Sequence, residues 1–160
     1  MSERNPYRLF VAHEFGDSAE YSQVFEYLES RNNFFYLNYS DPDAARPNAA
    51  SDVLQEVLRA QIRDVEAVIV PASMCGSPAG LVDFELRVAQ AFKKPIIAVR
   101  PFGGATSVPS ILLDAAAEVV EWDEREIIAG IRRAARGEDT STWDVIEFEM
   151  EDFKLDESEQ

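Results

Sequence analysis

Residues 67–92, AVIVPASMCGSPAGLVDFELRVAQAF, contain the pattern that decides the fold. The first four residues form a short apolar strand, residues 71–80 are a loop of small residues, and the remainder has the 3.6-residue period of a helix. Projected at about 100° per residue, five apolar side chains share one stripe of this helix: Leu81, Phe84, Val88, Ala91 and Phe92. Glu85 falls on the edge of the stripe, so the sequence predicts a half-buried carboxylate there.

Glu85 is the residue that this pattern singles out. It lies in the first turns of a helix that follows the carboxyl end of a strand, where open α/β sheets bind their ligands. The alternative interpretation is structural, because the helix macrodipole also favours a carboxylate near a helix N-terminus. On the opposite face, Asp83 and Arg87 are four residues apart and are expected to form an exposed ion pair.

The rest of the chain alternates strands with helices. Apolar runs predict five strands, at Arg8–His13, Phe34–Leu37, Ala67–Val70, Lys94–Val99 and Glu118–Glu121. Amphipathic helices are predicted after the capping-box pair Asp17 and Glu20, over Val53–Val65, over Leu81–Phe92 and over Glu124–Arg136. The alternation favours an α/β fold, a flavodoxin-like three-layer sandwich whose parallel five-stranded sheet has the order 2-1-3-4-5.

Length and charge restrict the class of protein. The 160 residues fit one domain of ordinary size, and 46% of them are hydrophobic. A formal charge of −15 argues against nucleic acid and anionic membranes as partners. The N-terminus does not resemble a signal peptide, no apolar run has membrane-span length, and Cys75 has no partner for a disulfide. These features predict a cytoplasmic protein.

The charge is concentrated at the C-terminus. Gly137–Gln160 carries −9 of the total, with ten acidic residues and one lysine. Apolar residues alternate with the acidic ones from residue 143 onward. We therefore divide the chain into a domain over residues 1–136 and an acidic amphipathic tail over residues 137–160. The alternation is typical of an added edge strand or of a docking segment.

Polar and aromatic residues at the expected strand ends are the remaining candidates for a site. His13 ends the first strand and is predicted to face the same crevice as Glu85. One interpretation is that it contacts ribose or phosphate or transfers a proton. The other is that its imidazole is bonded to a backbone carbonyl and has only a structural role. Phe15 and Phe84 have the chemistry to stack on a base but are more typical of a core. Ser73 and Ser77 are suited to bind a hydroxyl or phosphate group, or alternatively to form a turn. Arg100 is suited to bind a pyrophosphate, or alternatively faces solvent.

The motifs in this order resemble the TIR-like domains of the Thoeris ThsB type, a bacterial anti-phage branch of the Toll/interleukin-1 receptor superfamily. The resemblance covers roughly residues 8–134 and rests on the opening strand Phe10-Val11-Ala12-His13, on Leu81-Val82-Asp83-Phe84-Glu85, and on Lys94-Pro95-Ile96-Ile97-Ala98-Val99-Arg100-Pro101-Phe102-Gly103. Leu81 and Ala12 depart from the family's usual Trp and Ser.

The resemblance implies an enzyme that cleaves NAD⁺ at the nicotinamide–ribose bond, with cyclisation of ADP-ribose into a nucleotide signal as a further step. It makes Glu85 the catalytic acid. His13, from its place at the end of the first strand, is the second catalytic candidate. A carboxylate stabilises an oxocarbenium-like ribose, and no metal is needed because nicotinamide leaves as a neutral group. The substrate-binding candidates are Phe10, Ala12, Phe15, Ser73, Ser77, Phe84 and Arg100. Expected partners are the nucleotide, an effector protein that responds to the product, and further copies of the chain.

Two other functions remain open at this point. Nucleoside deoxyribosyltransferases share the flavodoxin-like layout and a helix-borne glutamate, which in them acts as a nucleophile. TIR domains also serve as non-catalytic adaptors that self-associate, and the acidic tail suits contact with a basic groove or a neighbouring subunit.

Overall fold

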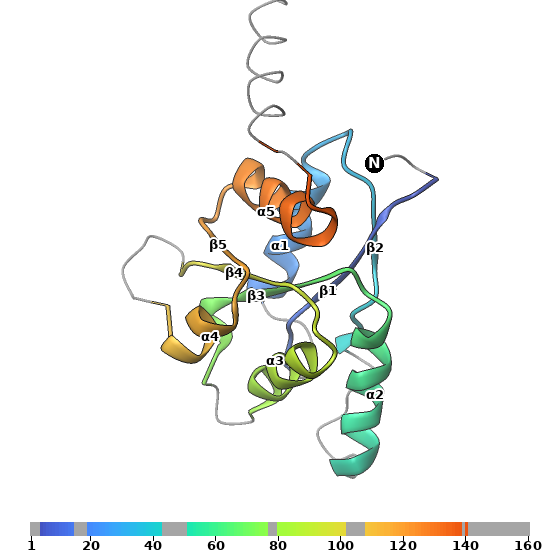
Figure 1. The fold of residues 1–160 in the computed structure, drawn as a ribbon, viewed down its shortest axis with the longest axis vertical. Helices are drawn as coiled ribbons and strands as arrows, with labels where there is room; N and C mark the ends of the chain where they lie inside the picture. Colours follow the sequence, from blue (N-terminus) through green and yellow to red (C-terminus); the bar gives the residue numbers. More distant parts are fainter. Residues whose placement is uncertain are drawn as a thin grey trace, which may run out of the picture.

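The fold is built on a parallel sheet, seen in a computed structural model that describes residues 4–14, 19–42, 51–76, 80–101, 108–138 and 140. The described residues form a five-stranded sheet of order β2-β1-β3-β4-β5, with every neighbouring pair parallel (Figure 1). The strands are β1 (Tyr7–Val11), β2 (Tyr36–Asn38), β3 (Ala67–Pro71), β4 (Ile96–Val99) and β5 (Glu118–Val120). The predicted fold class and strand order are confirmed.

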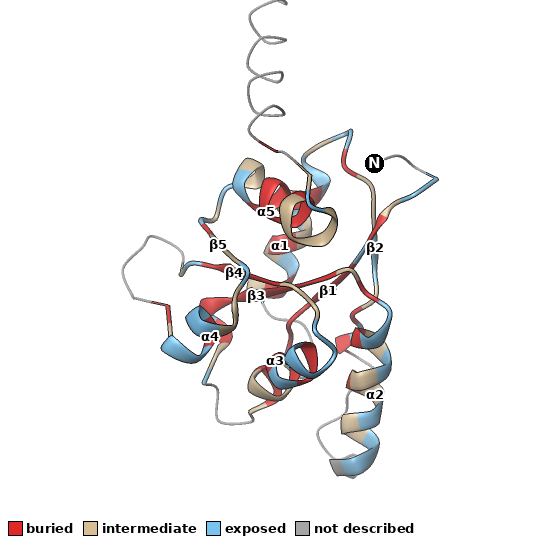
Figure 2. Cartoon of the chain, viewed as in Figure 1, coloured by how far each residue is buried: buried red, intermediate tan, exposed pale blue. Residues whose placement is uncertain are grey.

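The strands differ in burial according to their place in the sheet. Every residue of β3 and of β4 is buried, as expected of central strands with helices on both faces. The edge strands are short and only partly covered: β2 has no buried residue and β5 ends on buried Val120. Figure 2 shows this contrast, with the central strands red and the outer helical surfaces pale blue.

Helices cover both faces of the sheet. One face carries α1 (Ala19–Glu29) and α5 (Glu124–Arg136), and the other carries α2 (Ser51–Arg63), α3 (Leu81–Ala91) and α4 (Ser110–Ala115) (Figure 1). Successive strand residues point to opposite faces. Accordingly Leu9 and Val11 pack with α1 and α5, while Phe10 and Ala12 pack with α2, α3 and α4.

The prediction was most accurate for α5 and least complete for α4. The bounds of α5 agree with the predicted Glu124–Arg136, because both ends carry a signal. The Asp123 side chain accepts from the N–H of Glu126 at 3.0 Å, and Gly137 adopts a φ of 65° that suits glycine after the last turn. Helix α4 has only six residues, too few to show a period, and its place was not predicted.

Two further predictions concern membrane-spanning segments and the C-terminal tail. Within the described ranges, no helix has the length and apolar character needed to cross a membrane. Glu138 and Thr140 follow α5, and the remainder of the predicted tail, residue 139 and residues 141–160, lies outside the described residues. The division at residue 136 therefore stays a prediction.

Candidate functional site

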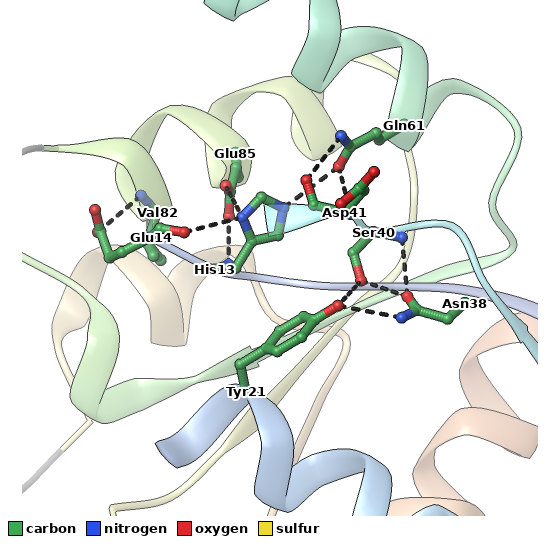
Figure 3. A network of polar contacts seen from close by, with 9 residues as sticks. All are labelled: His13, Glu14, Tyr21, Asn38, Ser40, Asp41, Gln61, Val82 and Glu85. Atoms are coloured by element: carbon green, nitrogen blue, oxygen red, sulfur yellow. Dashed lines mark hydrogen bonds and ion pairs between the residues drawn. The ribbon is translucent and has the colours of Figure 1, made fainter. Parts of the chain in front are cut away.

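The candidate site lies where β1 and β3 end and α3 begins. Strands β1 and β3 are neighbours, and the chain leaves them toward opposite edges of the sheet, which makes their carboxyl ends the switch point of this topology. The N–H of Ala12 donates to the Ile69 carbonyl at 2.8 Å, which extends the pairing beyond Val11. His13 comes next and turns toward α3 (Figure 3).

Glu85 is more deeply buried than its place in the pattern predicted. Its exposed fraction is 0%, and it belongs to the buried face of α3, which is formed by Leu81, Val82, Glu85, Leu86, Val88 and Ala89. Ala91 and Phe92, placed in the predicted stripe, are exposed. The buried face is rotated because α3 packs against both the sheet and α2, so Glu85 lies inside the face and not on its edge.

Glu85 contacts His13 through both of its carboxyl oxygens. Oε1 accepts a hydrogen bond from the backbone N–H of His13 at 2.9 Å. Oε2 lies 3.7 Å from Nδ1 of the His13 ring, too far for a hydrogen bond, and has no hydrogen-bond partner. Both side chains are 0% exposed. The structure thus brings the two predicted catalytic residues together with one carboxyl oxygen unsatisfied.

Burial shifts the pKa values of Glu85 and His13 in opposite directions. Burial raises the pKa of Glu85 well above its ordinary value, although the His13 N–H opposes the shift, and the nearby Glu14 charge raises it further. Burial lowers the pKa of His13, against the effects of Gln61, Glu14 and Asp41. The enclosed site therefore favours a neutral carboxyl group beside a neutral imidazole.

Glu14 caps the helix that carries Glu85. Gly80, at the N-cap position of α3, has a φ of 68° and no side chain to accept from the free N–H groups of the first turn. The Glu14 carboxylate supplies the acceptor, since its Oε2 takes a hydrogen bond from the Val82 N–H at 3.3 Å. The segment after β1 thus fixes the start of α3 as well as the Glu85 side chain.

A polar network that the sequence analysis did not assign surrounds His13. Gln61 of α2 bonds to Asp41, while Tyr21, Asn38 and Ser40 hydrogen-bond to one another beside them (Figure 3). Tyr21 also packs edge-on against the His13 ring, at 5.8 Å between centroids. One signal was present: Gln61 is a polar residue in the apolar period of its helix, which is the same anomaly that singled out Glu85.

The predicted substrate-binding residues occupy varied surroundings. Phe10 and Ala12 are fully buried in the core, and the Phe10 ring lies 5.3 Å from that of His13. Phe84 is partly buried between Arg59 and Arg87. Phe15, Ser77 and the predicted cap Asp17 lie outside the described residues. The roles of all these residues stay predictions.

Three of the residues named in the sequence analysis, Ser73, Arg100 and Asp83, form polar contacts with residues other than Glu85. Ser73 is exposed and its hydroxyl donates to Glu20 at 3.4 Å, while Arg100 pairs with Glu121 at 2.9 Å. Their predicted roles in substrate binding stay predictions. Asp83 accepts from the Gly76 N–H, in place of the expected pairing with Arg87. Among the described residues, no group of three or more His, Cys, Asp or Glu side chains is arranged to hold a metal ion.

Comparison with known proteins gives the family. No curated protein matches the chain. A sequence model described as Thoeris protein ThsB, TIR-like domain, matches residues 10–106, a range that includes His13, Gln61 and Glu85 and more than half of the chain. Thoeris is an anti-phage system, so the match implies a module of anti-phage defence. The chain therefore belongs to the ThsB TIR-like domain family.

Proposed function

We propose that this chain cleaves NAD⁺ at the nicotinamide–ribose bond and supplies a nucleotide signal in anti-phage defence. The observation that carries the proposal is the Glu85 carboxyl group, which is held by the His13 N–H through one oxygen and has the other oxygen free of hydrogen bonds. TIR-like domains often cleave NAD⁺, and the family membership makes this glutamate the expected catalytic group.

The reaction needs a negative charge beside the ribose and little else. As the bond between C1′ and the nicotinamide nitrogen breaks, its electron pair goes to the ring, which leaves as neutral nicotinamide. The ribose acquires oxocarbenium character, and the Glu85 carboxylate stabilises that charge. Water then attacks C1′ and releases one proton, giving ADP-ribose. In cyclisation a nucleophile of the same ADP-ribose attacks instead, again with loss of one proton.

The burial of Glu85 sets a condition on this reaction. A carboxyl group with no exposed surface contacts a ribose only after the site opens, so substrate binding and opening are coupled. The carboxylate is also the form that burial disfavours. The positively charged nicotinamide of NAD⁺ reverses this preference, because a nearby cation lowers the pKa of a buried carboxyl group. The site is thus expected to ionise when its cationic substrate enters.

The test is release of nicotinamide from NAD⁺, followed by chromatography of the nucleotide product. Concentrated purified protein is assayed with and without an infected-cell extract. Both conditions are needed because a signalling enzyme is expected to become active only after it assembles or receives a trigger. Glu85→Gln keeps an oxygen for the His13 N–H but removes the charge. We expect a loss of about 100-fold or more in the rate. Equal turnover by the two proteins would remove Glu85 from the mechanism.

The full burial of Glu85 and His13 also favours a second candidate, a non-catalytic interaction module. In that case the pair only ties the end of β1 to α3. Thermal unfolding separates the two candidates: NAD⁺ at about 100 times its Kd stabilises an enzyme by about 2.7 kcal/mol. An adaptor is unaffected by the nucleotide and releases no nicotinamide under either condition.

A further inference from the structure

The two helical faces of the molecule differ in how their cations are paired. On the face of α1 and α5, the three arginines near the end of α5 each pair with a glutamate, at 2.7 to 3.9 Å. On the other face, Arg63 of α2 and Arg87 of α3 are exposed, and neither forms an ion pair with a described carboxylate. The same holds for Lys93 and Lys94, which follow α3. Because the chain has 30 acidic residues and only 15 basic ones, such a group of cations needs an explanation.

Phe84 joins the cations of the two helices. The guanidinium of Arg59 on α2 lies 5.6 Å from the centre of the Phe84 ring, and that of Arg87 on α3 lies 6.0 Å from it. The ion pair of Arg59 with Glu56, at 3.9 Å between exposed side chains, is a weak one. Arg63 lies one turn beyond Arg59. Both helices lead into neighbouring parallel strands, β3 and β4, so both end at the amino edge of the sheet. We call this surface the α2–α3 patch, which consists of Arg59, Arg63, Phe84, Arg87, Lys93 and Lys94.

The α2–α3 patch combines positive charge with apolar surface (Figure 2). Phe84 and Leu54 are only partly buried, and Phe92, next to the two lysines, is 38% exposed. Helix α4 also exposes two apolar side chains, Ile111 and Leu113, but it contains an aspartate and no cation. Aromatic residues and arginines are both enriched in protein interfaces. The patch therefore suits a peptide in which apolar side chains alternate with acidic ones.

The chain itself contains such a peptide, over residues 141–160. This segment has eight acidic residues and one lysine, which give a net charge of −7. Its apolar residues are interspersed with the acidic ones and are Trp143, Val145, Ile146, Phe148, Met150, Phe153 and Leu155. Its 20 residues match the size of one side of a standard interface, about 20–30 residues. Charge, apolar pattern and length therefore make this segment the occupant that fits the patch.

The position of Thr140 decides which copy of the chain supplies the segment. Thr140 is buried, and its hydroxyl oxygen accepts from Arg133 of α5. The segment thus departs from the α5 face, whereas the α2–α3 patch lies on the opposite face of the sheet (Figure 1). Trp143 comes three residues later and lies at most about 11 Å from Thr140, which is no more than the width of one helix. Trp143 therefore falls short of the patch of its own chain.

We propose that residues 141–160 of one copy dock on the α2–α3 patch of a second copy. When the two copies exchange their segments, the same contact forms twice and closes a symmetric dimer. The carboxylates of the segment meet the arginines and lysines of the patch, and its apolar side chains cover Phe84. This contact is independent of the proposed function, because it involves neither NAD⁺ nor the Glu85 carboxyl group.

Sedimentation equilibrium of the full chain tests this contact. The wild type is expected to be a dimer. Arg63→Glu/Arg87→Glu reverses two exposed charges of the patch, and Ile146→Asp/Phe148→Asp removes two apolar side chains of the segment. Each double variant is expected to raise the Kd of the dimer by about 100-fold or more. Arg4→Glu, the same reversal at an exposed cation outside the patch, should dimerise as the wild type does.

Mixing the two double variants is the decisive step, after thermal unfolding has shown that both are folded. The first variant retains its segment and the second retains its patch, so the mixture restores one of the two contacts. We expect the mixture to associate in a 1:1 ratio at concentrations at which each variant alone is monomeric. A monomeric wild type, or a dimer that either double change leaves intact, would overturn the proposal. A mixture that does not associate would also overturn it, because the segment and the patch would then not contact each other.

Discussion

Two glutamates at opposite ends of the sheet have opposite environments. Glu66 precedes β3, and its side chain is 13% exposed. Arg136 donates to both of its oxygens, at 2.7 and 2.9 Å, and the Arg8 N–H donates at 3.0 Å. Glu85, beyond the carboxyl end of β3, has no exposed surface, one hydrogen bond, and one oxygen without any.

The difference is visible in the direction of the two pKa shifts. Burial raises the pKa of Glu66, but the hydrogen bonds and charges of Arg136 and Arg8 outweigh burial and leave the pKa below its ordinary 4.5. For Glu85, burial dominates and the pKa rises. The amino end of the sheet therefore has a satisfied ion pair that holds the fold. The carboxyl end has a carboxyl group whose charged form is disfavoured by burial, which is an arrangement typical of functional sites.

The largest effect on stability is expected from Glu66→Gln. The amide cannot replace the charge that Arg136 pairs with, so the free energy of unfolding falls by about 2–3 kcal/mol at neutral pH. Because the folded pKa of Glu66 is depressed, its contribution is present above the ordinary pKa and is lost as the pH falls through the folded pKa. Urea denaturation at a series of pH values should show this deficit shrinking in acid. A deficit that grows in acid would contradict the assignment.

The matched variant Glu85→Gln is expected to have the opposite pH dependence. The folded state keeps the proton on Glu85 at pH values where the unfolded state has lost it, so the wild type loses stability as the pH rises above the ordinary pKa of 4.5. The variant lacks this loss. Its stability relative to the wild type should increase with pH, by at most about 1.4 kcal/mol per pH unit. A difference independent of pH would show that Glu85 is ionised in the folded protein.

The smallest effect is expected from Tyr7→Phe at the amino end. The ring, which stacks on Phe34 at 5.3 Å and lies 3.9 Å from the Arg136 guanidinium, is retained. Only the hydroxyl that donates to Glu138 is lost. Urea denaturation should show a loss of about 1 kcal/mol, with nicotinamide release unchanged. A change in nicotinamide release would contradict the separation of the two ends.

The fold was predictable from the sequence because its signals are local. The uniformly apolar runs of β3 and β4 and the capped, periodic α5 each indicate their own structure, and alternation supplies the topology. Helix α4 and the short edge strand β2 have too few residues for a period, so their bounds were missed or displaced.

The site was predictable only in part. Glu85 and Gln61 interrupt apolar patterns, and such interruptions can be read along one helix. Their contacts cannot be read from the sequence in this way, because the hydrogen bonds to His13 and Asp41 join residues that are 72 and 20 positions apart. The depth of Glu85 also depends on how α2 packs beside α3, which a projection of one helix does not contain.

The most direct measurement compares nicotinamide release from NAD⁺ by the wild type, Glu85→Gln and Glu66→Gln at equal protein concentration, with and without infected-cell extract. All three must first be shown to be folded at the assay temperature. The account predicts that Glu66→Gln releases nicotinamide at close to the wild-type rate, while Glu85→Gln loses about 100-fold or more. Release by Glu85→Gln at the wild-type rate would contradict it.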